Sequence, residues 1–522
     1  MRRIIAACLL AGFLIATAVN ADVRALTDEQ WQADIEQLSE AIKSIHFKPF
    51  HNLTETEFDT SIDKLLYGLS EKSDKEIVVA MAKIVAQLRD GHTRVHIPRL
   101  YPEFALEAEL GHSGTPPPKV ESLKFAQLPV RFELFDDGLF IIAARPEFSE
   151  LIGHRVAKFD ETPVEAAISA VRSVSFVEND SRAKLMAPDR LGLPDVLAFL
   201  GIISAPESLS LTTHGADGEP VSTELRALTE PGLGFVDGLP ESLPSWQKHR
   251  DKYRWYEVRP DDDAIYVQVN QFEEQPVRPY GEFVAETVAA AREAGVSRYI
   301  IDLRHNSGGM GAWVTPFVTG LSRSEFNEYG RLFVLMGRTT FSAAQHCLHR
   351  FEEMTYAAFV GEPSGAKPSH YGDGRRVVLT NSGITIRVST IYWHSWLAND
   401  FRDAINPHLP VALEAEDYFQ GEDPVLSAAI RYKAPPSLAG QIDQQFRLGA
   451  NQNALLLFTR FMSDGSQTDH ERVVSELRLM ADTLAKDGFV RPGYFVYFLL
   501  NQTFPGDRET QAGLEKLGAM VD

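Results

Sequence analysis

The chain has 522 residues, 44% of them hydrophobic, which is enough for about two to four domains with buried cores. Its 51 basic and 72 acidic side chains give a formal net charge of −21, which excludes binding to nucleic acid or to anionic membrane surfaces through overall charge. Only two cysteines are present, and Cys8 lies in an apolar leader, so Cys347 has no partner for a disulfide in the mature chain.

Residues 1–21 have the features of a signal peptide. Two arginines precede an apolar run over residues 4–18, and residues 19–21 offer small side chains at a cleavage site. The run is shorter than the roughly 20 apolar residues that a membrane span needs. We therefore expect cleavage before Asp22, a periplasmic or extracellular location and no stable membrane insertion afterwards, with an uncleaved anchor as the alternative.

Residues 22–97 are predicted to form a helical N-terminal domain. Apolar residues recur at helical spacing in three stretches, about 35–45, 58–69 and 77–88. A β-rich middle region is predicted over residues 98–261. It contains a hairpin around 136–138, a strand at 155–159, and loop-rich tracts at 98–122 and 213–248, and a PDZ-like fold is one candidate for it.

Residues 262–432 are predicted to form an α/β core, because strands and helices alternate along this part of the chain. The expected elements are strands at 264–269, 299–303 and 332–336, helices at 283–294, 314–321 and 343–354, and a closing strand at 384–389. A helical C-terminal domain is predicted over 433–522. The fold class is therefore a multidomain α+β or α/β protein.

Three segments of this core carry residues that could perform chemistry. The first, Asp302-Leu303-Arg304-His305-Asn306-Ser307-Gly308-Gly309, leaves a buried strand and ends in two glycines, whose exposed N–H groups can hold an oxyanion. A purely structural turn would have a similar sequence. In the second, residues 337–345, Ser342 stands near the start of a helix. It is either a helix N-cap or a nucleophile at a strand-to-helix turn. The third, residues 360–372, is a long Gly/Pro loop of the kind that more often has a function than not.

In their order and spacing these segments resemble the S41 peptidase family, which comprises the C-terminal-processing (tail-specific) proteases and a tricorn-like branch. The strand that ends in Asp-Leu-Arg-x-Asn-x-Gly-Gly is the most recognisable motif of that family. The Thr-x-Ser-Ala-Ala turn around Ser342, the Val-Gly-Glu-Pro-Ser-Gly stretch at 360–365 and the segment 88–93 resemble further family features. The similarity covers roughly residues 75–415.

The resemblance implies that Ser342 attacks the scissile carbonyl and that N–H groups of Gly308, Gly309 and Ala343 form the oxyanion hole. It offers two general bases. In the Ser-Lys scheme the base is a lysine 25 residues after the serine, which is Lys367, and its pKa would have to be lowered by burial. In the tricorn-like scheme the base is a histidine of the upstream segment, His92. We favour His92, because a histidine needs no large pKa shift near neutral pH, and keep Lys367 as the alternative.

The sequence departs from both schemes. The glutamine expected four residues after the lysine is Tyr371, and the serine expected before the histidine is Gly91. The acidic partner of the tricorn-like scheme falls near Asp400 or Asp403, and His370 and Tyr371 are candidate contacts on the substrate side. No metal or other cofactor is expected, because the histidine pairs 346/349 and 92/96 lack further ligands at a suitable spacing.

The sequence therefore predicts an exported serine peptidase whose substrate is a peptide or an unfolded protein. Two alternatives stay open. The chain could be a catalytically inactive S41-like protein that binds peptides or other ligands, which the departures at Gly91 and Tyr371 would permit. It could also be a serine hydrolase of non-peptide esters or amides, because the predicted site does not fix the acyl group.

Overall fold

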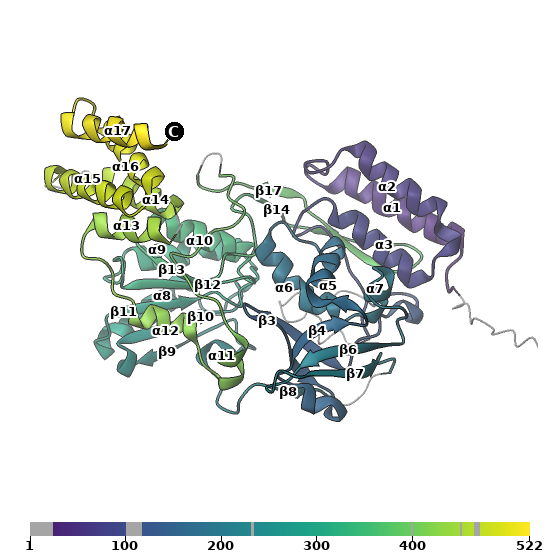
Figure 1. The fold of residues 1–522 in the computed structure, drawn as a ribbon. Coiled ribbons are helices and arrows are strands. Elements are labelled where there is room, and N and C mark those ends of the chain that lie inside the picture. Colours follow the sequence, from purple (N-terminus) through teal and green to yellow (C-terminus); the bar gives the residue numbers. More distant parts are fainter. Residues whose placement is uncertain are drawn as a thin grey trace, which may run out of the picture.

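The computed structural model describes residues 24–100, 117–230, 234–397, 400–448, 451–463 and 470–521. The expected signal peptide lies outside these residues. The described part is a mixed α/β protein built from several domains, and it forms two halves (Figure 1). The N-terminal helices and the middle domain make one half, and the α/β core with the C-terminal helices makes the other. No helix within the described residues is both long and apolar enough to cross a membrane.

Three helices begin the described chain: α1 (Asp28–Ile45), α2 (Glu55–Tyr67) and α3 (Asp74–Ala86). Each begins with a capping box, in which a threonine or serine side chain accepts a hydrogen bond from the third helical residue. Their apolar faces share one core with residues that come from far along the chain, Leu379, Ile384, Ile386 and Val388. The N-terminal domain is therefore completed by a segment that leaves the α/β core.

That segment forms a three-stranded antiparallel sheet with the N-terminal domain, in the order β1 (Arg94–Val95), β16 (Thr385–Val388) and β15 (Arg375–Val378). The expectation that residues 384–389 close the α/β core was therefore wrong. The apolar pattern of this short strand would suit the sheet of the α/β core as well as that of the N-terminal domain. Its long-range pairing with β1 places it in the N-terminal domain. A second pair, β14 (His370–Gly372) with β17 (Ile391–Trp393), flanks this sheet in the sequence and runs between the two halves (Figure 1).

The described part of the middle domain has an antiparallel sheet and three α-helices. The strands follow the order β2 (Val130–Phe135), β3 (Gly138–Ala144), β4 (Arg155–Phe159), β6 (Ser208–His214) and β7 (Pro220–Arg226), with β5 (Thr162–Pro163) and β8 (Val236–Asp237) at its side. The helices are α5 (Val164–Val171), α6 (Asp180–Leu191) and α7 (Pro194–Phe199). The hairpin around 136–138 and the strand at 155–159 are confirmed, whereas the tract 213–248 contains β7 and part of β6 in addition to loops.

The α/β core is a six-stranded sheet with helices on both faces. Its order is β18 (Leu409–Pro410), β13 (Ala358–Gly361), β12 (Leu332–Met336), β11 (Arg298–Asp302), β10 (Ala264–Val269) and β9 (Arg254–Arg259), and only β9 is antiparallel. The helices α8 (Tyr280–Ala294), α9 (Val314–Ser322) and α10 (Ala343–Met354) contribute to one apolar cluster, and α12 (Pro424–Arg431) contributes to the cluster that contains Tyr266 and Phe333. Buried parallel strands read as continuous apolar runs, which is why the sequence located β10, β11 and β12 closely.

The remaining helices follow the core. Helix α11 (Ala415–Gln420) packs against the middle domain through Tyr418, whose ring lies 5.3 Å from that of Phe135. In its described residues the C-terminal domain consists of five helices, α13 (Leu438–Arg447), α14 (Asn451–Ser463), α15 (His470–Lys486), α16 (Val490–Thr503) and α17 (Arg508–Val521). They enclose their own apolar cluster, in which Tyr497 is buried.

Candidate active site

Ser342 stands at the turn between strand β12 and helix α10. Its backbone has a φ of 54° and a ψ of −121°, a conformation that a residue with a side chain rarely adopts. Although Ser342 occupies the N-cap position, its side chain makes no capping hydrogen bond, and N-cap residues normally have extended backbone. The geometry is that of a strained strand-to-helix turn, as found at nucleophile elbows, and strain of this kind clusters at functional sites.

The two glycines after strand β11 lie against this turn. A Cβ atom on Gly308 would come within 2.8 Å of the Ser342 Cβ and 3.1 Å of the Ala343 nitrogen, so only glycine permits this approach. A Cβ on Gly309 would lie 2.0 Å from the carbonyl oxygen of Phe272. The structure thus brings together all three residues that the family resemblance assigns to an oxyanion hole.

Asn306 connects the glycine turn to the serine turn. Its side chain donates to the Val269 carbonyl at 3.0 Å and accepts from the Gly308 N–H at 2.8 Å, while its own carbonyl accepts from the Phe341 N–H at 3.2 Å. Of the three residues expected to form the oxyanion hole, Gly308 therefore has its N–H engaged, and Gly309 and Ala343 are left as the candidates.

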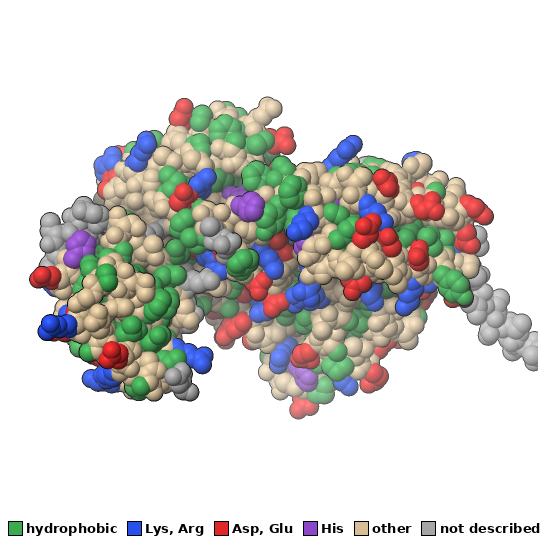
Figure 2. Space-filling model, turned by 90° about the horizontal axis from the view of Figure 1, so that it is seen from above, with side chains coloured by type: hydrophobic (Ala, Val, Ile, Leu, Met, Phe, Trp, Pro, Cys, Tyr) green, Lys and Arg blue, Asp and Glu red, His purple; other side chains and the backbone are tan. Residues whose placement is uncertain are grey.

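Ser342, His92 and Gly309 line one cavity of about 1240 Å³. One wall comes from the glycine turn and residues 271–275 of the core, and another comes from the β1–β16–β15 sheet of the N-terminal domain. Figure 2 shows Lys/Arg and Asp/Glu side chains gathered where the two halves of the molecule meet. A pocket between two domains, with convergent polar groups, is the usual location of an active site.

His92 reaches this cavity through a loop that Asp90 holds in place. The two carboxylate oxygens of Asp90 accept hydrogen bonds from the His92 backbone N–H at 2.8 Å, from Thr93 Oγ1 at 2.5 Å and from His46 Nε2 at 3.0 Å. Phe341, next to Ser342, stacks on the His92 ring with centroids 4.4 Å apart. The loop thereby carries the histidine to the nucleophile turn.

Electrostatics keep His92 neutral and Asp90 charged. Burial, and then the proximity of His370, lower the pKa of His92 well below its usual value. Burial alone would raise the pKa of Asp90, but the hydrogen bond from His46, together with the proximity of the His92 and His46 rings, holds it below its usual range. His92 is therefore unprotonated at neutral pH, as a group that accepts a proton must be.

The middle domain contributes residues that sequence reasoning missed. A Cβ atom at position 91 would lie 2.8 Å from both Glu178 Oε1 and the Phe341 ring. The space in which the serine of the tricorn-like scheme would stand is therefore filled by these two side chains. Burial raises the pKa of the Glu178 carboxyl well above its usual value. Arg182 lies over the Phe341 ring at 4.2 Å. No motif marks these residues, because they lie on and beside α6, far from the core in sequence.

The structure separates Lys367 from this cavity. Its Nζ lies 2.9 Å from Asp403 Oδ1, and 40% of its side-chain surface is exposed. Both residues line another pocket, of about 280 Å³, that does not include Ser342. Asp400 is held by Arg402, whose guanidinium also binds Glu352. The two candidate acidic partners therefore have other cationic partners, and Asp90 is the carboxylate that contacts the His92 segment.

His370 and Tyr371 lie behind His92 and are not among the residues that line the Ser342 cavity. The His370 ring donates from Nδ1 to the Lys367 carbonyl at 3.0 Å and stacks on His92 at 5.7 Å. Burial lowers the pKa of His370 to about 4. Burial also raises the pKa of Tyr371 to about 12, and its ring contacts His51 at 4.4 Å.

His346 and His349 extend this group of buried rings along α10. Their centroids are 5.8 Å apart, and that of His346 is 5.0 Å from His370. Within the described residues, no three His, Cys, Asp or Glu side chains are arranged to hold a metal ion.

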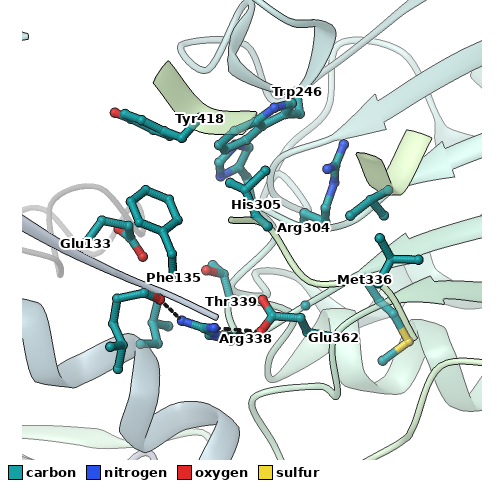
Figure 3. Close-up of a pocket in the computed structure, with 16 residues that line it drawn as sticks. Glu133, Phe135, Trp246, Arg304, His305, Met336, Arg338, Thr339, Glu362 and Tyr418 are labelled. Carbon is teal, nitrogen blue, oxygen red and sulfur yellow. Dashed lines mark hydrogen bonds and ion pairs between the residues drawn. The ribbon is translucent and has the colours of Figure 1, made fainter. Parts of the chain in front are cut away.

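A second, smaller pocket of about 160 Å³ lies between the middle domain and the core (Figure 3). Trp246 stacks on His305 there, with ring centroids 5.4 Å apart. Arg338, from the turn before Ser342, binds Glu362 and the Leu134 carbonyl. Neither Ser342 nor His92 lines this pocket. The contact of Arg338 with the Leu134 carbonyl joins the nucleophile turn to strand β2.

Comparison with known proteins shows what the fold resembles. No family model and no curated protein matches the chain. The chain is similar to the structure of mature CPAF complexed with lactacystin, at 13% identity and a TM-score of 0.51, over 83% of this chain and 99% of that chain. A second structure of mature CPAF matches at 14% identity and a TM-score of 0.51, over 84% and 99%. The photosystem II D1 C-terminal processing protease matches at 15% identity and a TM-score of 0.33, over 76% of this chain and 98% of that chain.

At these identities the likeness to CPAF shows a shared fold. It extends over nearly the whole of the CPAF chain, so it includes more than the α/β core. This fold fits the S41-like peptidase that the sequence motifs predict.

Proposed function

We propose that the chain is a serine peptidase that hydrolyses peptide bonds through an acyl-enzyme on Ser342. One observation carries this proposal: a serine in a strained strand-to-helix turn opens onto the same cavity as a buried, neutral histidine and a glycine turn. Nucleophile, base and oxyanion donors are the three parts that acyl transfer needs. The likeness in fold to CPAF supports the same reading.

In the proposed reaction, Ser342 Oγ attacks the scissile carbonyl carbon and gives its proton to His92. The negative charge that develops on the carbonyl oxygen is held by the N–H groups of Gly309 and Ala343. His92 then passes the proton to the leaving amine, and the acyl group stays on Ser342. Water, activated by the same histidine, releases the acid product and restores the serine.

His92 is proposed as the base in preference to Lys367. A base must be unprotonated and must share the cavity of the nucleophile, and His92 meets both conditions. Lys367 is paired with Asp403 in a different pocket, so it does not share the cavity of the nucleophile. Asp90 serves as a positioning residue, because it fixes the backbone of His92 and its negative charge stabilises the imidazolium that forms during the reaction.

Export and the nature of the middle domain are also part of the proposal. The basic and apolar leader over residues 1–21 supports a signal peptide and a periplasmic or extracellular enzyme. The antiparallel strand path of the middle domain, with α5 and α6 beside it, is compatible with a PDZ-like peptide-binding module.

The experiment that tests the proposal follows the hydrolysis of an unfolded protein, such as reduced and alkylated casein, by the wild type and three alanine variants. We expect Ser342→Ala and His92→Ala to abolish turnover and Lys367→Ala to retain most of it. Loss of turnover in Lys367→Ala with retention in His92→Ala would reverse the assignment of the base. If the wild type cleaves simple esters but no peptide, the substrate class is wrong.

A further inference from the structure

The wall of the Ser342 cavity that comes from the N-terminal domain carries a row of three arginines. In the sheet register, Arg94 of β1 lies directly opposite Arg387 of β16, and Arg387 lies directly opposite Arg376 of β15. Residues directly opposite each other in a sheet point to the same face. All three line the cavity together with Ser342 and His92.

This arrangement opposes the stability of the sheet. Like charges directly opposite each other are destabilising, and burial together with the charge of Arg376 lowers the pKa of Arg387. The buried Nε of Arg387 has no hydrogen-bond partner among the described residues. The row also contrasts with a chain whose net charge is −21. Because three adjacent positive charges destabilise the sheet and yet lie on the wall of the candidate active site, we infer that they bind an anionic group.

Neighbouring residues hold the row in place. The Arg94 guanidinium lies over the Phe176 ring, 4.8 Å from its centroid. A Cβ on Gly374 would come within 2.5 Å of Arg387 Cγ, so the glycine leaves the space that the arginine stem occupies. Asp373 lies on the same wall and interacts with Arg387.

The other charged groups of the cavity set its polarity. His96 lies on the arginine wall, and Glu273 and Glu274 lie on the core wall. Arg254 pairs with Glu273 at 3.5 Å. The cavity is therefore cationic on one side and acidic on the other, so that an anionic group would be attracted to one wall only.

We propose that the row of Arg94, Arg387 and Arg376 is a carboxylate-binding subsite, which selects peptides that carry an acidic side chain in the segment bound along this cavity. Guanidinium groups bind carboxylates in a bidentate, charge-assisted manner. The carboxylate is that of an Asp or Glu side chain of the bound peptide, and a free C-terminus is the alternative that the test distinguishes. This inference rests on the proposed peptidase function for its substrate, and it concerns recognition rather than the chemical step.

The test measures binding without catalysis, by isothermal titration calorimetry on the full-length Ser342→Ala protein. Three unlabelled peptides of otherwise identical sequence are compared: one with a central Glu and an amidated C-terminus, one with Gln and a free C-terminus, and one with Gln and an amidated C-terminus. We expect the peptide with the central Glu to bind about tenfold tighter than the neutral one. Tighter binding of the peptide with the free C-terminus alone would show that the row holds a terminal carboxylate, and it would overturn the assignment to a side chain.

The arginine variants are made in the same background. Arg387→Gln and Arg376→Gln should each remove most of the preference, and the exposed Arg376 guards against a folding defect at the half-buried Arg387. Arg375→Gln is the matched control, because Arg375 is the adjacent residue of β15 and does not line the cavity. The subsite proposal is overturned if acidic and neutral peptides bind equally, if no peptide binds, or if the preference survives in both variants. Absence of turnover in the wild type, with the preference intact, would instead overturn the peptidase and leave the subsite standing.

Discussion

Ser342 should be a position at which glycine gives a more stable protein than alanine does. Its φ of 54° and ψ of −121° are accessible to glycine and strained for other residues. A residue held in such a region costs about 1–3 kcal/mol, whereas glycine adds about 0.5–1 kcal/mol of conformational entropy to the unfolded chain. Replacement by glycine should therefore raise the free energy of unfolding by about 1 kcal/mol relative to replacement by alanine, which keeps the strain.

Urea denaturation of Ser342→Gly and Ser342→Ala, followed by circular dichroism, measures this difference directly. Both variants lack the hydroxyl, so the comparison isolates the backbone. We expect a higher midpoint for the glycine variant with an unchanged slope. Equal midpoints, or a lower midpoint for Ser342→Gly, would refute the argument that the nucleophile turn is strained.

Three further predictions concern the base, the oxyanion turn and the buried histidines. His92→Ala should lower kcat/KM for casein at least about a hundredfold, whereas Lys367→Met should leave it within about threefold; the reverse order would contradict the assignment of the base. Gly309→Ala should destabilise the protein by about 3 kcal/mol in urea denaturation, because its Cβ would overlap a backbone carbonyl oxygen at a positive φ. Gly311→Ala, where a Cβ meets nothing within 4 Å, is its control and should change little. His370, whose pKa burial lowers to about 4, binds its proton more readily in the unfolded state, so stability should be lost as the pH falls from about 6.5 toward 4, on the order of 3 kcal/mol for this group. Denaturation curves at pH 7 and 4.5 should show a smaller pH effect in His370→Asn, and an equal effect would contradict this reading.

The α/β core was predictable because its signals are local. Buried strands such as 264–269 and 332–336 are continuous apolar runs between turn residues, and they coincide with β10 and β12. The helix at 343–354 likewise coincides with α10. The motif residues followed from these elements, since the ends of neighbouring parallel strands meet at one edge of the sheet.

The surroundings of the site were not predictable in the same way. The strand at 384–389 has an apolar pattern that suits any sheet, and only its pairing with β1 assigns it to the N-terminal domain. Glu178 and Arg182 reach the site because the middle domain folds back onto the core, which no local pattern encodes. The arginine row depends on the register of three short strands. Each of these features is set by long-range contacts.

The central claim, that Ser342 is an activated nucleophile, is tested most directly by covalent labelling. The wild type, Ser342→Ala and His92→Ala are treated with a fluorophosphonate probe at pH 7, and the modified peptide is identified by mass spectrometry. We predict that the wild type is labelled on Ser342 alone and that both variants fail to react. Labelling at another residue, or no labelling of a folded wild type, would contradict the account.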